Sequence, residues 1–130
     1  MNGGYTHMSV LDVEDVAEKA GFSEIQEARF AHGDLEAEQT GFSFHRYKPG
    51  KRQAFGHRHD GAEEVYFVVS GSGRVKLDDE ILDLRPLEAV RVSPGVMRSF
   101  EAGDDGLEIL AFGPRRAEDP GEVVQGWWSD

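Results

Sequence analysis

The chain contains no cysteine, and this absence removes a whole class of chemistry. Without thiols the protein forms no disulfide, has no cysteine nucleophile and cannot build a zinc site from cysteine side chains. Any metal ion would have to be held by His, Asp, Glu or water.

Positive charge is also scarce, because 14 Lys and Arg face 25 Asp and Glu, which gives a formal net charge of −11. Such a surface repels phosphate backbones and anionic lipid headgroups, so we expect no nucleic-acid partner and no membrane partner. The longest apolar run, residues 65–69, is far too short to span a bilayer. The polar start MNGGYTHM lacks the basic and apolar regions of a signal peptide. The sequence therefore predicts a cytoplasmic protein.

The chain length of 130 residues suits one domain with one hydrophobic core. No internal repeat, low-complexity tract or linker interrupts the sequence. We therefore predict a single domain over residues 1–130.

Helical periodicity is confined to the N-terminal region. Apolar residues recur at helical spacing within SVLDVEDVAEKAG, and the final Gly21 stands where the end of a helix favours glycine. This stretch predicts one short helix.

From residue 25 onward, short β-like runs alternate with turn residues. The runs are GFSFHRY, EVYFVV, RVKL, ILDL, AVRV and GLEILAF, and turn signals such as KPGK, SGSG and SPG separate them. This pattern is typical of an all-β sandwich or barrel. Because EVYFVV is apolar on both faces, we expect a second layer over it, either the opposite sheet or a second copy of the chain in a homodimer.

The stretch FGHRHDGAEEVYFVVSGSG, residues 55–73, carries the strongest chemical signal. Side chains at i and i+2 of a strand share one side, so His57 and His59 can converge on one target. The segment DGAE can turn the chain so that Glu64 begins a strand beside the first. Two imidazoles and a carboxylate suit a divalent metal ion. The same residues also fit a polar loop that leads into a β-strand.

The spacing of this stretch resembles the first conserved motif of the cupin superfamily, which reads His-x-His, three or four residues, Glu, six residues, Gly. The matching residues are His57, His59, Glu64 and Gly71. The count of six residues before the glycine selects Glu64 over its neighbour Glu63.

The second cupin motif is degenerate in this chain. In LEAVRVSPGVMRSFEA, residues 87–102, only Gly95 matches a motif position, and Arg98 stands where the family has its fourth metal ligand, a histidine. A guanidinium stays protonated and offers only hydrogen-bond donors, so it cannot bind a metal ion and is repelled by one.

The resemblance implies a cupin β-barrel, also called a double-stranded β-helix or jelly roll, over residues 40–113, with a short N-terminal helix and extensions at both ends. In metal-binding cupins the matching residues hold Fe, Mn, Zn, Ni or another divalent ion. Two outcomes remain open for this chain. His57, His59 and Glu64 form a three-ligand metal site completed by water or substrate, or Glu64 pairs with Arg98 in a metal-free pocket.

Three further residues are predicted to bind substrate. Arg98 suits a carboxylate or phosphate because its planar group can donate two parallel hydrogen bonds. Tyr66 shares the strand face of Glu64, and Phe100 shares the face of Arg98. Tyr66 and Phe100 also fit ordinary core positions. Whether His45, on the run GFSFHRY, points inward is not decided by the pattern.

Two functions are consistent with these residues. The first is a small cupin-domain protein with a divalent-metal site that acts on or binds a small oxygenated or anionic molecule, as a metal-dependent oxygenase or isomerase. The alternative is a non-catalytic, metal-free cupin that binds a small ligand with Arg98 as anion anchor. The two tryptophans at 127 and 128 fit packing over the barrel or a partner subunit, or ligand stacking.

Overall fold

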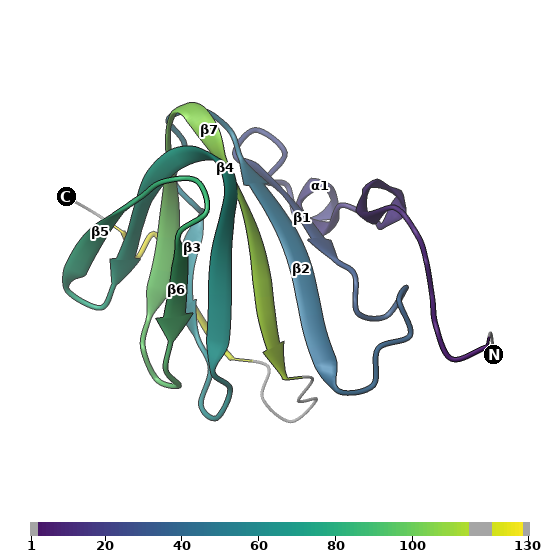
Figure 1. Cartoon of the computed structure of the whole chain (residues 1–130). Helices are drawn as coiled ribbons and strands as arrows, with labels where there is room; N and C mark the ends of the chain where they lie inside the picture. The colour runs from purple at the N-terminus through teal and green to yellow at the C-terminus, as the bar shows by residue number, and fades with distance from the viewer. Residues whose placement is uncertain (1–2, 115–120, 129–130) are drawn as a thin grey trace.

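In this computed structural model, which describes residues 3–114 and 121–128, β-strands dominate and curl around one interior (Figure 1). The structure confirms the predicted all-β fold. The elements in chain order are the 3-10 turn η1 (Val10–Asp12), α1 (Val16–Lys19), β1 (Gln26–Phe30), β2 (Thr40–Tyr47), β3 (Phe55–Arg58), β4 (Glu64–Leu77), β5 (Glu80–Leu84), β6 (Ala89–Val92), β7 (Arg98–Pro114) and β8 (Glu122–Gln125).

The N-terminal helix is shorter than the periodicity predicts, because Asp15 caps it just after the separate turn η1. The Asp15 carboxylate accepts hydrogen bonds from the backbone N–H of Ala17 in α1, at 3.0 Å, and of Ala28 in β1, at 2.9 Å. This one side chain therefore both starts the helix and fixes it beside β1. Within the described residues, no helix has the length and apolarity needed to cross a membrane.

Strands β4 and β7 are the two longest strands of the fold, and they pair antiparallel along nearly their whole length. The first part of β4 and the second part of β7 join β1, β2 and β6 in one half of the barrel. The remaining parts of the two long strands join β3, β5 and β8 in the other half. Each long strand therefore belongs to both halves, as the ribbon shows (Figure 1).

The SGSG segment does not end a strand, contrary to the sequence-based expectation. EVYFVV and RVKL are parts of the single strand β4, and the SGSG residues form its bend, with register shifts against β7. Gly71 has a φ of +80°, and a Cβ on it would overlap the carbonyl oxygen of Gly106 in β7. Here glycine keeps two bending strands hydrogen-bonded instead of closing a turn.

The two faces of β4 differ strongly in burial. Tyr66 and Val68 point into the core and are 4% and 1% exposed, whereas Val65 and Val69 on the outer face are 36% and 39% exposed. The layer that covers the inner face is the opposite half of the barrel. The core cluster contains Tyr47, Tyr66, Val68, Val75, Leu84, Val92, Phe100, Ala102, Leu107, Ile109 and Ala111.

The tryptophans near the C-terminus pack over the barrel, which was one of the predicted alternatives. Trp128 is 7% exposed, and the guanidinium carbons of Arg52 and Arg74 lie 5.0 and 5.4 Å from the centre of its ring. Lys76 lies over the ring of Trp127 at 4.6 Å. These cation–π contacts hold the segment after β8 against the wall of the barrel.

The bend of β4 gives the first prediction. We expect Gly71→Ala to lower the free energy of unfolding clearly more than the control Gly50→Ala, because at Gly71 two paired strands must also separate. Gly50 lies outside the bend and should lose about 1–2 kcal/mol, because only its positive φ of +71° is strained and no atom lies within 4 Å of the added Cβ. Urea denaturation of both variants measures this, and equal losses would contradict the role of the bend.

Candidate metal centre

His57 and His59 present their rings to the same region, as the strand alternation predicts. His57 lies in β3 and His59 follows the end of that strand, and their ring centres are 5.5 Å apart with planes at 83°. Arg58 lies on the other side, where its guanidinium forms an ion pair with Glu122 of β8 at 2.7 Å. The short strand therefore aims both imidazoles at one point.

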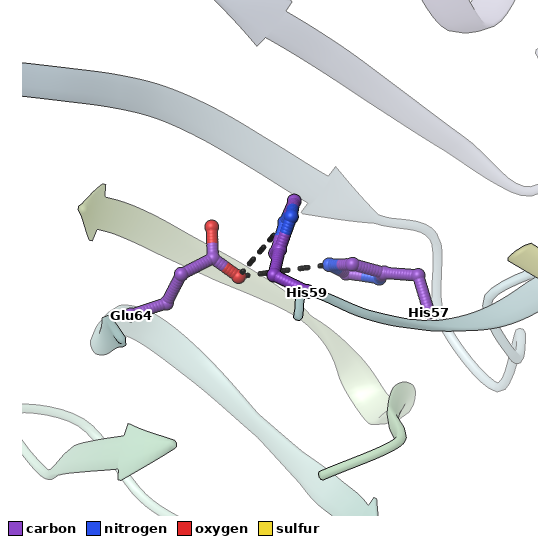
Figure 2. Close-up of side chains that lie close together, drawn as sticks. All are labelled: His57, His59 and Glu64. Carbon is purple, nitrogen blue, oxygen red and sulfur yellow. Dashed lines mark ion pairs between the residues drawn. The ribbon is translucent and has the colours of Figure 1, made fainter. Parts of the chain in front are cut away.

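Glu64 approaches the histidines from the other half of the barrel. The expectation that its strand lies beside the histidine strand is wrong, because β3 pairs with β7 and β8, whereas the first part of β4 pairs with β6 and β7. Closure of the barrel brings the carboxylate across the interior, and both imidazoles point toward it (Figure 2). The group therefore depends on the two halves facing each other.

The three side chains lie close enough to share one ion. The Nε2 atoms of His57 and His59 are each 3.7 Å from Oε1 of Glu64, and one ligand atom from each residue lies within 4.8 Å of the others. The neighbouring carboxylate of Glu63 points outward, is 58% exposed and pairs with Arg91. The structure thus brings together the three residues selected from the motif spacing.

The donor set fits a divalent transition metal ion. Imidazole nitrogens and carboxylate oxygens bind such ions at about 2.0–2.2 Å, so two ligands of one ion lie up to about 4.4 Å apart. The two distances of 3.7 Å fall within this span. Two His and one carboxylate leave further coordination positions open. The chain therefore has a candidate metal-ligand group.

Arg98 occupies the position of the family's fourth ligand and pairs with Glu64. It begins β7 directly opposite His57, its side chain is 0% exposed, and its Nη1 lies 3.4 Å from Oε1 of Glu64. Its Nη2 donates to the backbone oxygen of Ser93 at 3.3 Å. Arg98 does not line the adjoining cavity described below. Its role as a substrate anchor stays a prediction, and its immediate partner is the Glu64 carboxylate.

Tyr66 also donates to the same carboxylate oxygen, at 2.5 Å. Burial and the nearby charge of Glu64 raise the Tyr66 pKa well above its usual value, so its hydroxyl keeps its proton. Burial by itself raises the pKa of Glu64, but the close His57 ring, the hydrogen bond from Tyr66 and the charges of His57 and His59 outweigh this effect and lower the pKa to about 2. The carboxylate is therefore ionised at neutral pH.

A cavity of about 260 Å³ opens beside this group. Tyr66 and Phe100, which were predicted to contact substrate, both line it, together with all three candidate ligands. His45 faces inward and lines it as well. Burial, with a smaller contribution from the charge of His57, lowers the pKa of His45 to about 4, so this ring is neutral at pH 7.

Sequence reasoning missed Gln26, which lines the cavity from β1 and is 3% exposed. The signal was present in the segment EIQEARF. Ala28 and Phe30 alternate there with Glu27 and Arg29, which places Gln26 on the apolar side of a strand. The sequence pattern does not predict this strand, because the segment is short and rich in charge.

The fold and the site define a curled β-barrel with two histidines and one carboxylate grouped in its interior. Comparison of the sequence with known families gives a match to the cupin domain over residues 43–112, more than half of the chain and inside the barrel predicted over residues 40–113. The chain therefore belongs to the cupin family. None of the curated proteins compared with the chain matches it in sequence.

Solved structures support the same fold. A cupin protein from Bacteroides fragilis is similar with a TM-score of 0.69 and 21% identity, over 98% of each chain. A polyketide cyclase from Streptomyces resistomycificus has a TM-score of 0.74 and 19% identity, over 96% of this chain and 87% of that one. An oxalate decarboxylase from Bacillus subtilis has a TM-score of 0.72 and 22% identity, over 92% of this chain and 31% of that one.

The lowered pKa of Glu64 gives a prediction for protein treated with a chelator. A carboxyl whose pKa falls from 4.5 to about 2 on folding stabilises the fold above pH 4.5, and this contribution disappears as the pH falls toward 2. We expect Glu64→Gln to lower the free energy of unfolding by roughly 3 kcal/mol at pH 7 and by less than half as much near pH 3.

Denaturant titrations at several pH values measure this difference. Glu63→Gln is the matched control, since this exposed carboxylate forms a surface ion pair and its loss should change stability little at any pH. A Glu64→Gln effect that stays constant from pH 7 to pH 3 would contradict the assigned environment of the carboxylate.

Proposed function

We propose that this protein is a metal-dependent cupin that binds a divalent transition metal ion at His57, His59 and Glu64 and acts on a small oxygen-containing molecule in the adjoining cavity. An oxygenase or isomerase reaction fits this arrangement. The observation that carries the proposal is the convergence of three ligand atoms, from opposite halves of the barrel, at the wall of one cavity.

The residues around the proposed metal position have separate roles. A divalent ion bound there supplies a Lewis acid with open positions for oxygen atoms of a small molecule. Glu64 serves as a ligand, because its lowered pKa makes it a poor base at neutral pH. Tyr66 and Arg98 hold the carboxylate in place through its Oε1 atom. The aromatic side chains of the cavity keep bulk water away from the bound molecule.

A second candidate function, a metal-free binding protein, is favoured by one observation. The guanidinium of Arg98 is completely buried beside Glu64 and already balances its charge, so the pair is neutral without an ion. For Arg98 to anchor an anionic ligand in this function, its guanidinium would have to leave Glu64 and enter the cavity, which it does not line. The same arrangement reduces the attraction of the site for a dication, so the metal content of the purified protein separates the two functions.

Elemental analysis of protein purified without chelator tests the proposal. We expect about one transition metal ion per chain in the unchanged protein, and little in His57→Ala or His59→Ala, because each variant lacks one of three ligands. His45→Gln is the matched control, since His45 lines the same cavity but lies outside the ligand group. An unchanged metal content in His57→Ala would place the ion elsewhere, and metal-free native protein would favour the binding function.

The substitution at the fourth ligand position gives a further prediction. Arg98→His removes a buried positive charge 3.4 Å from the carboxylate and adds an imidazole where the family has a ligand. We expect the variant to bind divalent metal at least about tenfold more tightly, since the repulsion that it removes amounts to several kcal/mol at this range. Competition with a chromogenic chelator measures the affinity, and an unchanged or weaker affinity would contradict the role assigned to Arg98.

The cytoplasmic location, the homodimer and the lack of nucleic-acid and membrane partners stay predictions from the sequence. The exposed apolar side chains on the outer face of β4, such as Val65 and Val69, are where a second copy would pack.

A further inference from the structure

The walls of the cavity beside the metal group are rich in aromatic side chains. Phe22, Phe30, Phe55 and Phe100 line it from four different parts of the chain, and Tyr47 lies among them. Aromatic walls favour flat rings, which can stack on them or meet them edge to face. A cavity of about 150 Å³ can hold one benzene molecule, so one of about 260 Å³ has room for a molecule of one or two fused rings.

The charge in the cavity argues against an anionic ligand. Among the described residues that line it, Glu64 is the only carboxylate and none is Lys or Arg. The guanidinium of Arg98 lies against Glu64 and is fully buried. A carboxylate away from the metal group would lose its hydration without meeting a cation of the protein. A cationic ligand gains no free counter-charge either, because Glu64 is already paired with Arg98. These features together favour an uncharged molecule.

Three polar side chains that line the cavity have a buried atom without a partner, and one of them, His57, belongs to the metal group. The amide oxygen of Gln26 and the Nδ1 atom of His45 are buried and form no hydrogen bond. Buried unpaired groups of this kind cost stability and are rare in folded proteins. By contrast, the amide oxygen of Gln53 in the same cavity accepts a hydrogen bond from the backbone N–H of Phe100 at 3.2 Å. Gln53 thus has a structural partner, whereas Gln26 and His45 have unused capacity.

The side chains of Gln26 and His45 lie near each other on the inner face of the barrel. In the pairing of β1 with β2, His45 is opposite Ala28 and Gln26 is opposite Tyr47. Gln26 and His45 are therefore diagonal neighbours, a relation that long side chains can bridge. The terminal amide of Gln26 needs only a rotation about its last bond to turn toward the cavity.

A hydroxyl group matches this pair better than other oxygen groups. The amide oxygen of Gln26 can only accept, so a carbonyl or a carboxylate of the ligand cannot satisfy it. The neutral His45 ring contacts the Ser43 hydroxyl through Nε2 at 2.8 Å, and its Nδ1 either donates or accepts, depending on the tautomer. A hydroxyl both donates and accepts, so it can pair with Gln26 and with either tautomer of His45.

We infer that the cavity takes an uncharged, flat ring compound that carries a hydroxyl group, and that Gln26 and His45 select this hydroxyl. This inference rests on the proposed function, because it names the class of molecule that lies beside the metal group. It makes Gln26 and His45 residues that determine specificity and leaves the metal ligands as assigned.

Three probes of similar size test the inference in chelator-treated protein: 1-naphthol, naphthalene and 1-naphthoate. We expect equilibrium dialysis to show that 1-naphthol binds about five- to tenfold more tightly than naphthalene, because the probe that lacks the hydroxyl leaves Gln26 and His45 unpaired. 1-Naphthoate should bind most weakly. Equal binding of 1-naphthol and naphthalene, tighter binding of 1-naphthoate, or no binding of any probe would overturn the inference.

Two matched variants separate a selecting role from a structural one. Gln26→Met should bring the affinity for 1-naphthol down to that for naphthalene while the unfolding midpoint stays the same or rises, since an unpaired buried amide is removed. Gln53→Met should lower the unfolding midpoint and keep the preference for 1-naphthol, since it loses a hydrogen bond used in the fold. A lower midpoint in Gln26→Met with an unchanged preference would assign Gln26 to the fold and overturn its selecting role.

The proposed function and this inference fail separately. The probes are measured without metal, and the metal content is measured without probes. If the purified protein holds no metal but prefers 1-naphthol, the proposed metal site is refuted and the inferred ligand class is supported. If the protein holds a full metal content but shows no such preference, the ligand class is refuted and the metal site is supported.

Discussion

Strands β4 and β7 stay hydrogen-bonded to each other while both bend through a glycine-rich segment, and the interior of the protein exists because of this bend. Each long strand contributes one part to each half of the barrel, so the halves face each other across a short distance. The histidines of the β3 region belong to one half, and Glu64 and Tyr66 belong to the other. Without the bend, these side chains would be spread over a flat sheet.

Within this interior, one carboxylate oxygen is shared by several partners. Tyr66 and Arg98 donate to Oε1 of Glu64, and both imidazoles of the ligand group face the same atom. In a medium of low polarity the short hydrogen bond from Tyr66 and the nearby cationic groups keep the carboxylate ionised. The buried arginine makes this cupin different from the family pattern. It balances the charge of Glu64, so a metal ion bound at the proposed site would share this oxygen with the guanidinium.

The cavity combines an apolar wall with a few polar groups whose hydrogen-bonding capacity is unused. Burying Gln26 and His45 in this way lowers the stability of the empty protein, and such a cost is typical of sites shaped for a ligand. Gln53 lines the same cavity and shows the other use of a buried amide, because its oxygen accepts a hydrogen bond from the backbone N–H of Phe100. The two buried glutamines of this cavity therefore differ in role. The amide oxygen of Gln53 stabilises the fold, whereas that of Gln26 is available to a ligand.

The sequence alone determined the all-β fold, the short helix and the set of His57, His59 and Glu64, because alternation along a strand and the spacing of a motif are local properties. It determined neither the direction of His45 nor the strand that carries Gln26, and it placed the carboxylate on a neighbouring strand instead of the opposite half of the barrel. Only the tertiary structure decided that Arg98 turns toward Glu64 and away from the cavity. The physical reason is that local periodicity fixes the side of its own strand on which a residue lies, whereas the distance between strands is set by the closure of the whole sheet.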